Sequence, residues 1–269
     1  MKSHDFGQFL FNSSAFSNDQ IEELIKLAGK SEPTLAIEAL FLQLVEASEL
    51  TQADDEFVHT LITPRQAARA HELKDGQSLS LAQALIDNGI ADYSELSQLL
   101  EEYNKLEIPP LESALTAYYE KLNDYPDIDF PFAVDVISSF HSFLSESLNT
   151  TIIILPPSDC SDENQIGASV KIIGEIPVVV AMFADNDTFL RLAQRYDEYV
   201  ETIEDANDAI SELLNVFTGH FTVKIAVTKG LEEVPEPPRY GSVADTKCIT
   251  MMSDIGIFYV YIGKSEIFN

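Results

Sequence analysis

The chain has 269 residues, with 45 acidic and 16 basic side chains and a formal net charge of −29. A surface of this charge repels nucleic-acid phosphates and anionic lipid headgroups, so we expect neither nucleic-acid binding nor membrane insertion. The hydrophobic fraction of 45% and the charged fraction of 23% are typical of a folded globular protein, and the length suits two domains.

The sequence indicates a cytoplasmic protein. Residues 1–10 lack a long apolar run behind a basic start, as a signal peptide would have. The longest apolar runs, such as Ile176–Ala184, are too short to span a bilayer. Cys160 and Cys248 lie far apart without metal-ligand spacing, so we expect both to be reduced.

Residues 1–125 have the pattern of an all-α domain. Apolar residues recur at helical spacing from Ser17 to Glu49, and Thr63–Pro64 is typical of a helix start. We expect a regulatory or partner-binding domain without catalysis. Tyr125–Pro131 contains two prolines and no periodicity, which predicts a linker to a second domain over residues 126–269. Further short helices are predicted over residues 53–61, 63–73, 80–88, 93–103 and 111–122.

Residues 126–269 alternate between helical and strand patterns, which predicts an α+β layer fold. The dipeptide Pro156–Pro157 is expected to end the first strand, and Gly174–Glu175 to form a hairpin turn. The predicted helices cover residues 132–148, 187–199 and 203–227, and the predicted strands cover 150–155, 167–173, 176–184, 247–252 and 255–263.

The helix predicted from Ile203 to about Val227 has two distinct faces. At about 100° per residue, a polar stripe lies opposite a broad apolar face that can pack on a sheet. The stripe consists of Asp208, Glu212, Asn215 and Gly219. The apolar face consists of Ile203, Ala206, Ile210, Leu213, Leu214, Phe217 and Phe221.

This stripe resembles the active-site motif of the CheC/CheX/FliY phosphatases. That motif has Asp or Ser, then Glu four residues later, then Asn three residues further, and Pro after a gap of about twenty-two residues. Here these positions are Asp208, Glu212, Asn215 and Pro238. The resemblance covers roughly residues 130–269 and implies a CheX-like layer fold with a long active helix.

The resemblance implies hydrolysis of the aspartyl phosphate of a CheY-like receiver domain. Asn215 would orient the attacking water, and Glu212 would contact the receiver's active-site lysine. The chain would need no cofactor of its own, since Mg²⁺ is expected on the phosphorylated receiver. The alternative is a non-catalytic adaptor of the same fold that binds a receiver or a flagellar-switch component.

The other three residues of the motif and the stripe each have a specific interpretation. Asp208 is either a supporting residue of the site or part of the solvated acidic run around it. Gly219 either lets a partner backbone approach closely or serves packing or a bend. Pro238 is a family marker without a derived chemical role, and Pro235 and Pro237 stand beside it.

Some members of the family carry a second active helix. The corresponding positions here are Asp135, Ser139 and Ser142, so serine replaces both Glu and Asn. This departure predicts a single active site. The sequence leaves open whether the chain forms a homodimer as CheX does.

Overall fold

The computed structural model describes residues 6–50, 55–72, 76–119, 128–160, 165–242 and 246–264. The chain divides into two compact units, an N-terminal unit (Met1–Leu111) and a C-terminal unit (Glu112–Asn269). The sequence prediction put the boundary at residues 125 and 126, within a segment (120–127) that lies outside the described residues. The end of the predicted linker, Phe130–Pro131, forms the start of a helix.

The described elements of the N-terminal unit are all helical, in agreement with the predicted all-α domain. Three of the α-helices begin with a capping box, in which Ser17, Thr63 and Asp92 cap their own first turns. Buried aromatic rings, including Phe6 and Tyr103 at 5.5 Å, contribute to the core. The helices are α1 (Phe6–Asn12), α2 (Asn18–Ala28), α3 (Leu35–Phe41), the 3-10 helix η1 (Ala47–Glu49), α4 (Asp55–Leu61), α5 (Pro64–His71), α6 (Gly76–Asp87) and α7 (Tyr93–Lys105), and α8 (Pro110–Tyr119) begins at the boundary between the units.

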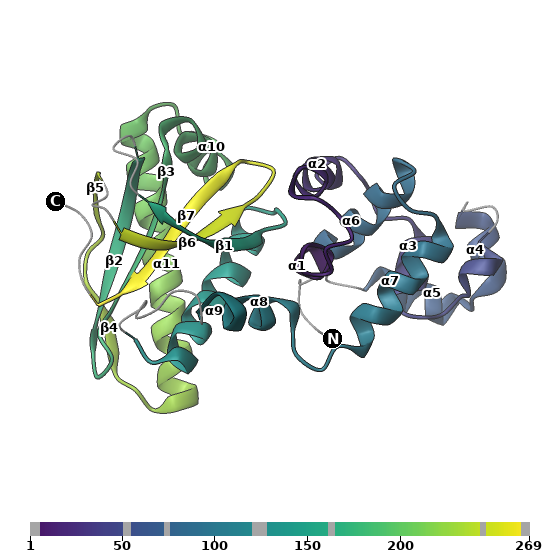
Figure 1. Ribbon diagram of the computed structural model, residues 1–269, viewed down its shortest axis with the longest axis horizontal. Coiled ribbons are helices and arrows are strands. Elements are labelled where there is room, and N and C mark those ends of the chain that lie inside the picture. The colour runs from purple at the N-terminus through teal and green to yellow at the C-terminus, as the bar shows by residue number, and fades with distance from the viewer. Residues whose placement is uncertain are drawn as a thin grey trace. The chain divides into compact units, whose positions relative to one another are not determined.

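The C-terminal unit is an α+β fold, which confirms the predicted fold class. Its strands pair antiparallel in the order β1-β6-β7-β3-β2-β4, and β5 also pairs with β2. The long helix α11 packs along the sheet beside β2, and α10 packs against β3 and α11 (Figure 1). The elements are α9 (Phe130–Ser147), β1 (Ile153–Cys160), β2 (Gln165–Gly174), β3 (Val178–Asp185), α10 (Asn186–Tyr196), α11 (Ile203–Lys229), β4 (Glu233–Pro235), β5 (Arg239–Ser242), β6 (Thr246–Met252) and β7 (Ile257–Gly263).

The prolines of β1 do not end the strand, so that expectation is wrong. β1 continues past Pro156–Pro157 to Cys160, with a shift in its pairing to β6 between Leu155 and Ser158. Proline has no N–H to donate, and an edge strand with a bulge tolerates this loss. β1 stands at the end of the strand order, where one side of the strand needs no ladder partner.

The cysteine expectation is also wrong. Cys248 on β6 is fully buried and takes part in a disulfide rather than being reduced. Its pattern in the sequence is that of a buried strand residue, which says nothing of its oxidation state.

Among the described residues, every helix is too short or too polar to cross a lipid bilayer.

Aromatic packing joins α9 to α11. The Phe140 and Phe217 rings lie 4.6 Å apart between centroids, and the Phe132 and Phe221 rings lie 6.0 Å apart. All four side chains are buried. Each buried phenylalanine contributes about 1.5–3 kcal/mol of transfer free energy, so this packing helps to fix the rotation of α11 about its axis.

Asp185 ends β3 and caps α10. Its carboxylate accepts hydrogen bonds from the backbone N–H groups of Asp187 and Thr188, both at 3.0 Å, and from the Thr188 hydroxyl at 2.8 Å. Burial alone would raise the pKa of the Asp185 carboxyl. The hydrogen bonds from Thr188 and Asp187 and the charge of Arg191 outweigh it and hold that pKa below its ordinary value.

Asp185→Ala is expected to lower the free energy of unfolding by about 1 kcal/mol at pH 7, because α10 loses its cap. The folded pKa is lowered, so the charge-dependent part of this stabilisation is present above the unfolded pKa of about 3.9. It is lost as pH falls through the lower folded pKa. Urea unfolding at several pH values measures both effects. Asp185→Asn keeps a capping acceptor and should lose less; equal stability of Asp185→Ala and the unaltered protein would contradict the capping role.

Candidate functional site

The long helix α11 is fixed at both ends by local hydrogen bonding. At its start, the Thr202 hydroxyl accepts from the Asp205 backbone N–H (3.2 Å), and the Asp205 carboxylate accepts from the Thr202 backbone N–H (2.9 Å). At its end, Gly230 adopts the left-handed conformation (φ 70°), which favours glycine. The 27 residues between them span about 40 Å.

The two predicted faces of α11 are present in the structure. Asp208, Glu212 and Asn215 are exposed, and Gly219 is half-buried on the same side. Ile203 is half-buried, whereas the rest of the predicted apolar face is buried. The buried residues of the helix are Ala206, Ala209, Ile210, Leu213, Leu214, Phe217, Thr218, Phe221, Thr222 and Ile225.

Glu212 and Asn215 are available to a partner. Among the described residues, no hydrogen bond or ion pair holds the Glu212 carboxylate or the Asn215 carboxamide. The two residues are three positions apart, which is about 4.5 Å along the helix axis. A carboxylate accepts hydrogen bonds and attracts a cation, while a carboxamide donates and accepts at once. Together they can bind an ammonium group and orient a water molecule within one small area.

Tyr196, the last residue of α10, lies within electrostatic reach of Glu212. Burial raises the pKa of the Tyr196 phenol, and the negative charges of Glu212 and Asp197 raise it further. The phenol therefore stays protonated and uncharged at neutral pH. The sequence does not predict this interaction, because Tyr196 and Glu212 lie on different helices. The turn between α10 and α11 brings them within electrostatic reach, and no sequence motif relates them.

Asp208 and Pro238 remain assignments by resemblance. Asp208 is exposed one turn before Glu212 on the stripe. Pro238 lies on a different element, in the connection between β4 and β5 at the edge of the sheet, and is half-buried. The two short strands pair with β2 on either side of this connection.

On α9, two of the positions that correspond to the motif, Asp135 and Ser139, are bonded to lysine side chains of α11. The Lys229 ammonium forms an ion pair with Asp135, and the Lys224 ammonium donates to the Ser139 hydroxyl at 2.8 Å. These side chains hold α9 and α11 together.

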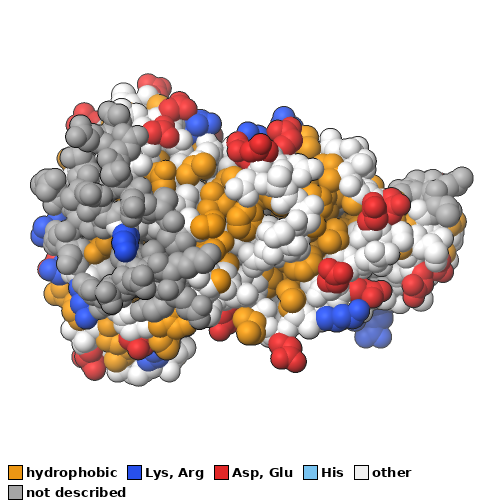
Figure 2. Space-filling model, viewed as in Figure 1, with side chains coloured by type: hydrophobic (Ala, Val, Ile, Leu, Met, Phe, Trp, Pro, Cys, Tyr) orange, Lys and Arg blue, Asp and Glu red, His pale blue; other side chains and the backbone are white. Residues whose placement is uncertain are grey.

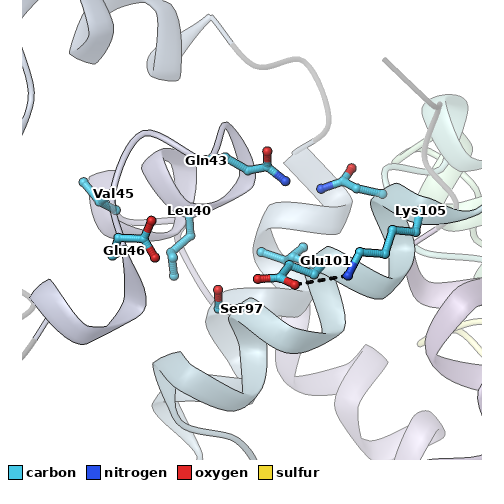
Figure 3. A pocket seen from close by; sticks show the side chains of 9 residues that line it. Leu40, Gln43, Val45, Glu46, Ser97, Glu101 and Lys105 are labelled. Carbon is cyan, nitrogen blue, oxygen red and sulfur yellow. Dashed lines mark hydrogen bonds and ion pairs between the residues drawn. The ribbon is translucent and has the colours of Figure 1, made fainter.

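Two hollows in the described surface lie away from the stripe. One, of about 640 Å³ in the N-terminal unit, is lined by polar side chains that include Gln43, Glu46 and Ser97 (Figure 3). In it Lys105 is paired with Glu101 at 3.2 Å. The other, of about 330 Å³, includes Arg191, Gln194, Arg195, Asp254 and Ile255. Its two guanidinium groups are paired with Asp187 and Asp254, at 2.9 and 2.8 Å.

Acidic side chains are spread over the visible face of both units rather than gathered in one patch (Figure 2). Within the part of the chain that the structure describes, no group of three or more His, Cys, Asp or Glu side chains is placed to hold a metal ion.

No protein-family model matches this chain, and no curated protein sequence matches it. Solved structures do. The structures that it resembles include CheX, CheC-like and FliY chemotaxis proteins.

Three of these likenesses cover about half of this chain and nearly all of the other protein. CheX from Desulfovibrio desulfuricans is 16% identical over 48% of this chain and 96% of its own, with a TM-score of 0.39. A CheC-like protein from Shewanella sp. PV-4 is 18% identical (50% and 97%, TM-score 0.42). The CheX–CheY–BeF₃–Mg²⁺ complex from Borrelia burgdorferi gives 18% (51% and 97%, TM-score 0.41). At these identities the likeness is one of fold, and no residue role is carried over from it.

Gly219 does not serve packing. A Cβ built at this position meets no atom within 4 Å, so a larger side chain would fit without displacing a neighbour. A glycine inside a helix costs about 0.5–1 kcal/mol relative to alanine, because it loses more backbone freedom on folding. Within the described residues, no neighbouring atom therefore requires a glycine at this position.

Gly219→Ala is expected to raise the free energy of unfolding by about 0.5–1 kcal/mol. Equilibrium urea unfolding measures this change. Gly256→Ala is the matched control and should destabilise, because Gly256 has a φ of 144° and its Cβ would lie 2.9 Å from the Thr188 hydroxyl. A loss of stability in Gly219→Ala would mean that the fold needs this glycine.

Proposed function

We propose that the C-terminal unit hydrolyses the aspartyl phosphate of a CheY-like receiver domain. The observation that carries this proposal is the presentation of Glu212 and Asn215. Both side chains point outward from α11, opposite its buried face, and no described residue holds them. The spacing of Asp208, Glu212, Asn215 and Pro238, which resembles the family motif, supports it from the sequence.

The reaction needs a positioned water more than a strong base. The water oxygen forms a bond to phosphorus as the bond between phosphorus and the aspartyl oxygen breaks, releasing a carboxylate and inorganic phosphate. One water proton stays on the phosphate and the other passes to solvent. Phosphoryl transfer depends mainly on positioning and charge stabilisation, and the Mg²⁺ of the receiver supplies much of the latter.

Asn215 suits the role of positioning group. Its carboxamide can accept a hydrogen bond from the water and donate one to a phosphoryl oxygen, which fixes the water in line with the breaking bond. Glu212, about one turn away, suits the role of anchor, since its carboxylate can pair with the lysine ammonium of the receiver's pocket. Neither residue needs to gain or lose a proton for these roles.

Asn215→Ala is expected to remove most of the acceleration of phosphate loss, by about 10²-fold or more, because the water is no longer oriented. The measurement is release of phosphate from a phosphorylated CheY-like receiver of the organism that makes this protein. Thr228→Ala is the control, since Thr228 is exposed on the same helix but off the stripe and bonds only to the Lys224 carbonyl among described residues.

Two outcomes of this assay would count against the proposal. Full activity in Asn215→Ala would show that the carboxamide does not orient the water. Binding of the receiver without any change in the lifetime of its phosphate would identify the chain as an adaptor rather than an enzyme.

A further inference from the structure

Charge divides α11 into two halves at Asn215. Every charged residue of the helix before Asn215 is acidic, and every one after it is basic. Helix dipoles favour this order, but their effect is confined to the first and last turns. Asp208, Glu212 and Lys224 lie further inside the helix, so the dipole does not explain them. The acidic residues are Glu204, Asp205, Asp208 and Glu212, and the basic residues are Lys224 and Lys229.

The basic half of α11 also carries exposed apolar side chains. Val223 is 64% exposed and Val227 is 82% exposed. Both are β-branched, and β-branched residues are poorer helix formers than the charged or alanine residues usual at such positions. At about 100° per residue, Ala226 lies in line with Asn215, Val223 is rotated about 40° from Gly219, and Val227 a further 40° in the same sense, at the margin of the stripe. We call Gly219, Val223, Ala226 and Val227 the apolar end of the stripe.

A receiver domain seated over Asn215 must cover more than Glu212 and Asn215. A specific interface buries about 800 Å² on each partner, which extends well beyond one helical turn. Along the helix axis, Val223 lies about 12 Å from Asn215 and Val227 about 18 Å. In the other direction, Asp208 lies about 10 Å from Asn215, and Glu204 and Asp205 follow in the first turn.

The charges on α11 distinguish docking toward its N-terminal half from docking toward its C-terminal half. The phosphorylation pocket of a receiver holds Mg²⁺ beside a phosphoaspartate, and such a site is built from carboxylates. Its rim is therefore repelled by the acidic half of α11 and not by the basic half. Lys224 and Lys229 are bonded to Ser139 and Asp135 of α9, while Val223 and Val227 stay exposed.

We infer that the receiver docks toward the C-terminal half of α11, with its phosphoaspartate pocket over Asn215 and an adjoining apolar strip over Val223 and Val227. This inference rests on the proposed function and adds the direction and chemistry of docking. Gly219, which leaves open space between the two contacts, lets the receiver backbone approach the helix there.

The test is steady-state dephosphorylation of a phosphorylated CheY-like receiver by the full chain. The double variant Val223→Gln/Val227→Gln removes the apolar contact and keeps good helix formers, so the fold is retained. It is expected to raise KM about tenfold or more with kcat at saturation nearly unchanged. Ile108→Gln, at a residue that is 57% exposed in the N-terminal unit, is the apolar control and should leave both constants unchanged.

A second variant tests the direction. Glu204→Gln removes one charge from the acidic end of α11 and is expected to leave KM unchanged or to lower it. An increase in KM with Glu204→Gln, or an unchanged KM with the double valine variant, would overturn the docking direction while the proposed function stands. Absence of any acceleration by the unaltered protein would instead overturn the proposed function.

Discussion

Burial of one face of α11 is the constraint on which the candidate site depends. The helix packs on the sheet beside β2, and its phenylalanines interlock with those of α9, including Phe140 against Phe217. Because these contacts fix the rotation of the helix, the residues opposite them point outward together. Among the described residues, no hydrogen bond or ion pair holds the Glu212 carboxylate or the Asn215 carboxamide.

The same helix also fixes where its acidic and basic side chains lie relative to Asn215. A chain with a net charge of −29 would repel a carboxylate-rich partner from most directions. On α11 the acids stop at Glu212 and the lysines begin at Lys224, with Asn215 and an exposed apolar surface between and beyond them. The inferred direction of receiver docking rests on this order of charges along the helix.

Much of this organisation could be predicted from the sequence, because it rests on periodicity. The apolar positions of α11 specify its buried face, and the polar stripe follows from the same spacing. Helix starts at Ser17 and Thr63 were recognisable from their capping residues and from Pro64. The CheC-like layer fold was predicted through a motif rather than through periodicity, since a few short strands do not define a topology by themselves.

The features that were missed depend on contacts between distant segments. Pro156 and Pro157 normally end a strand, but the edge position of β1 tolerates them. β4 and β5 are short and lie among prolines, so they have no recognisable strand pattern; only their pairing with β2 defines them. α1 was not predicted, and its seven residues give too little periodicity. The disulfide of Cys248 and the approach of Tyr196 to Glu212 likewise arise only in the folded chain.

The central claim is that α11 presents Glu212 to the active-site lysine of a receiver whose phosphoaspartate pocket lies over Asn215. The most direct measurement is a double-mutant cycle on binding of a beryllofluoride-loaded CheY-like receiver, combining Glu212→Gln here with replacement of that lysine by methionine. The account predicts that the two changes are coupled by about 1 kcal/mol or more, since each removes the same contact. Strictly additive effects would contradict it, because they would mean that the two side chains do not meet.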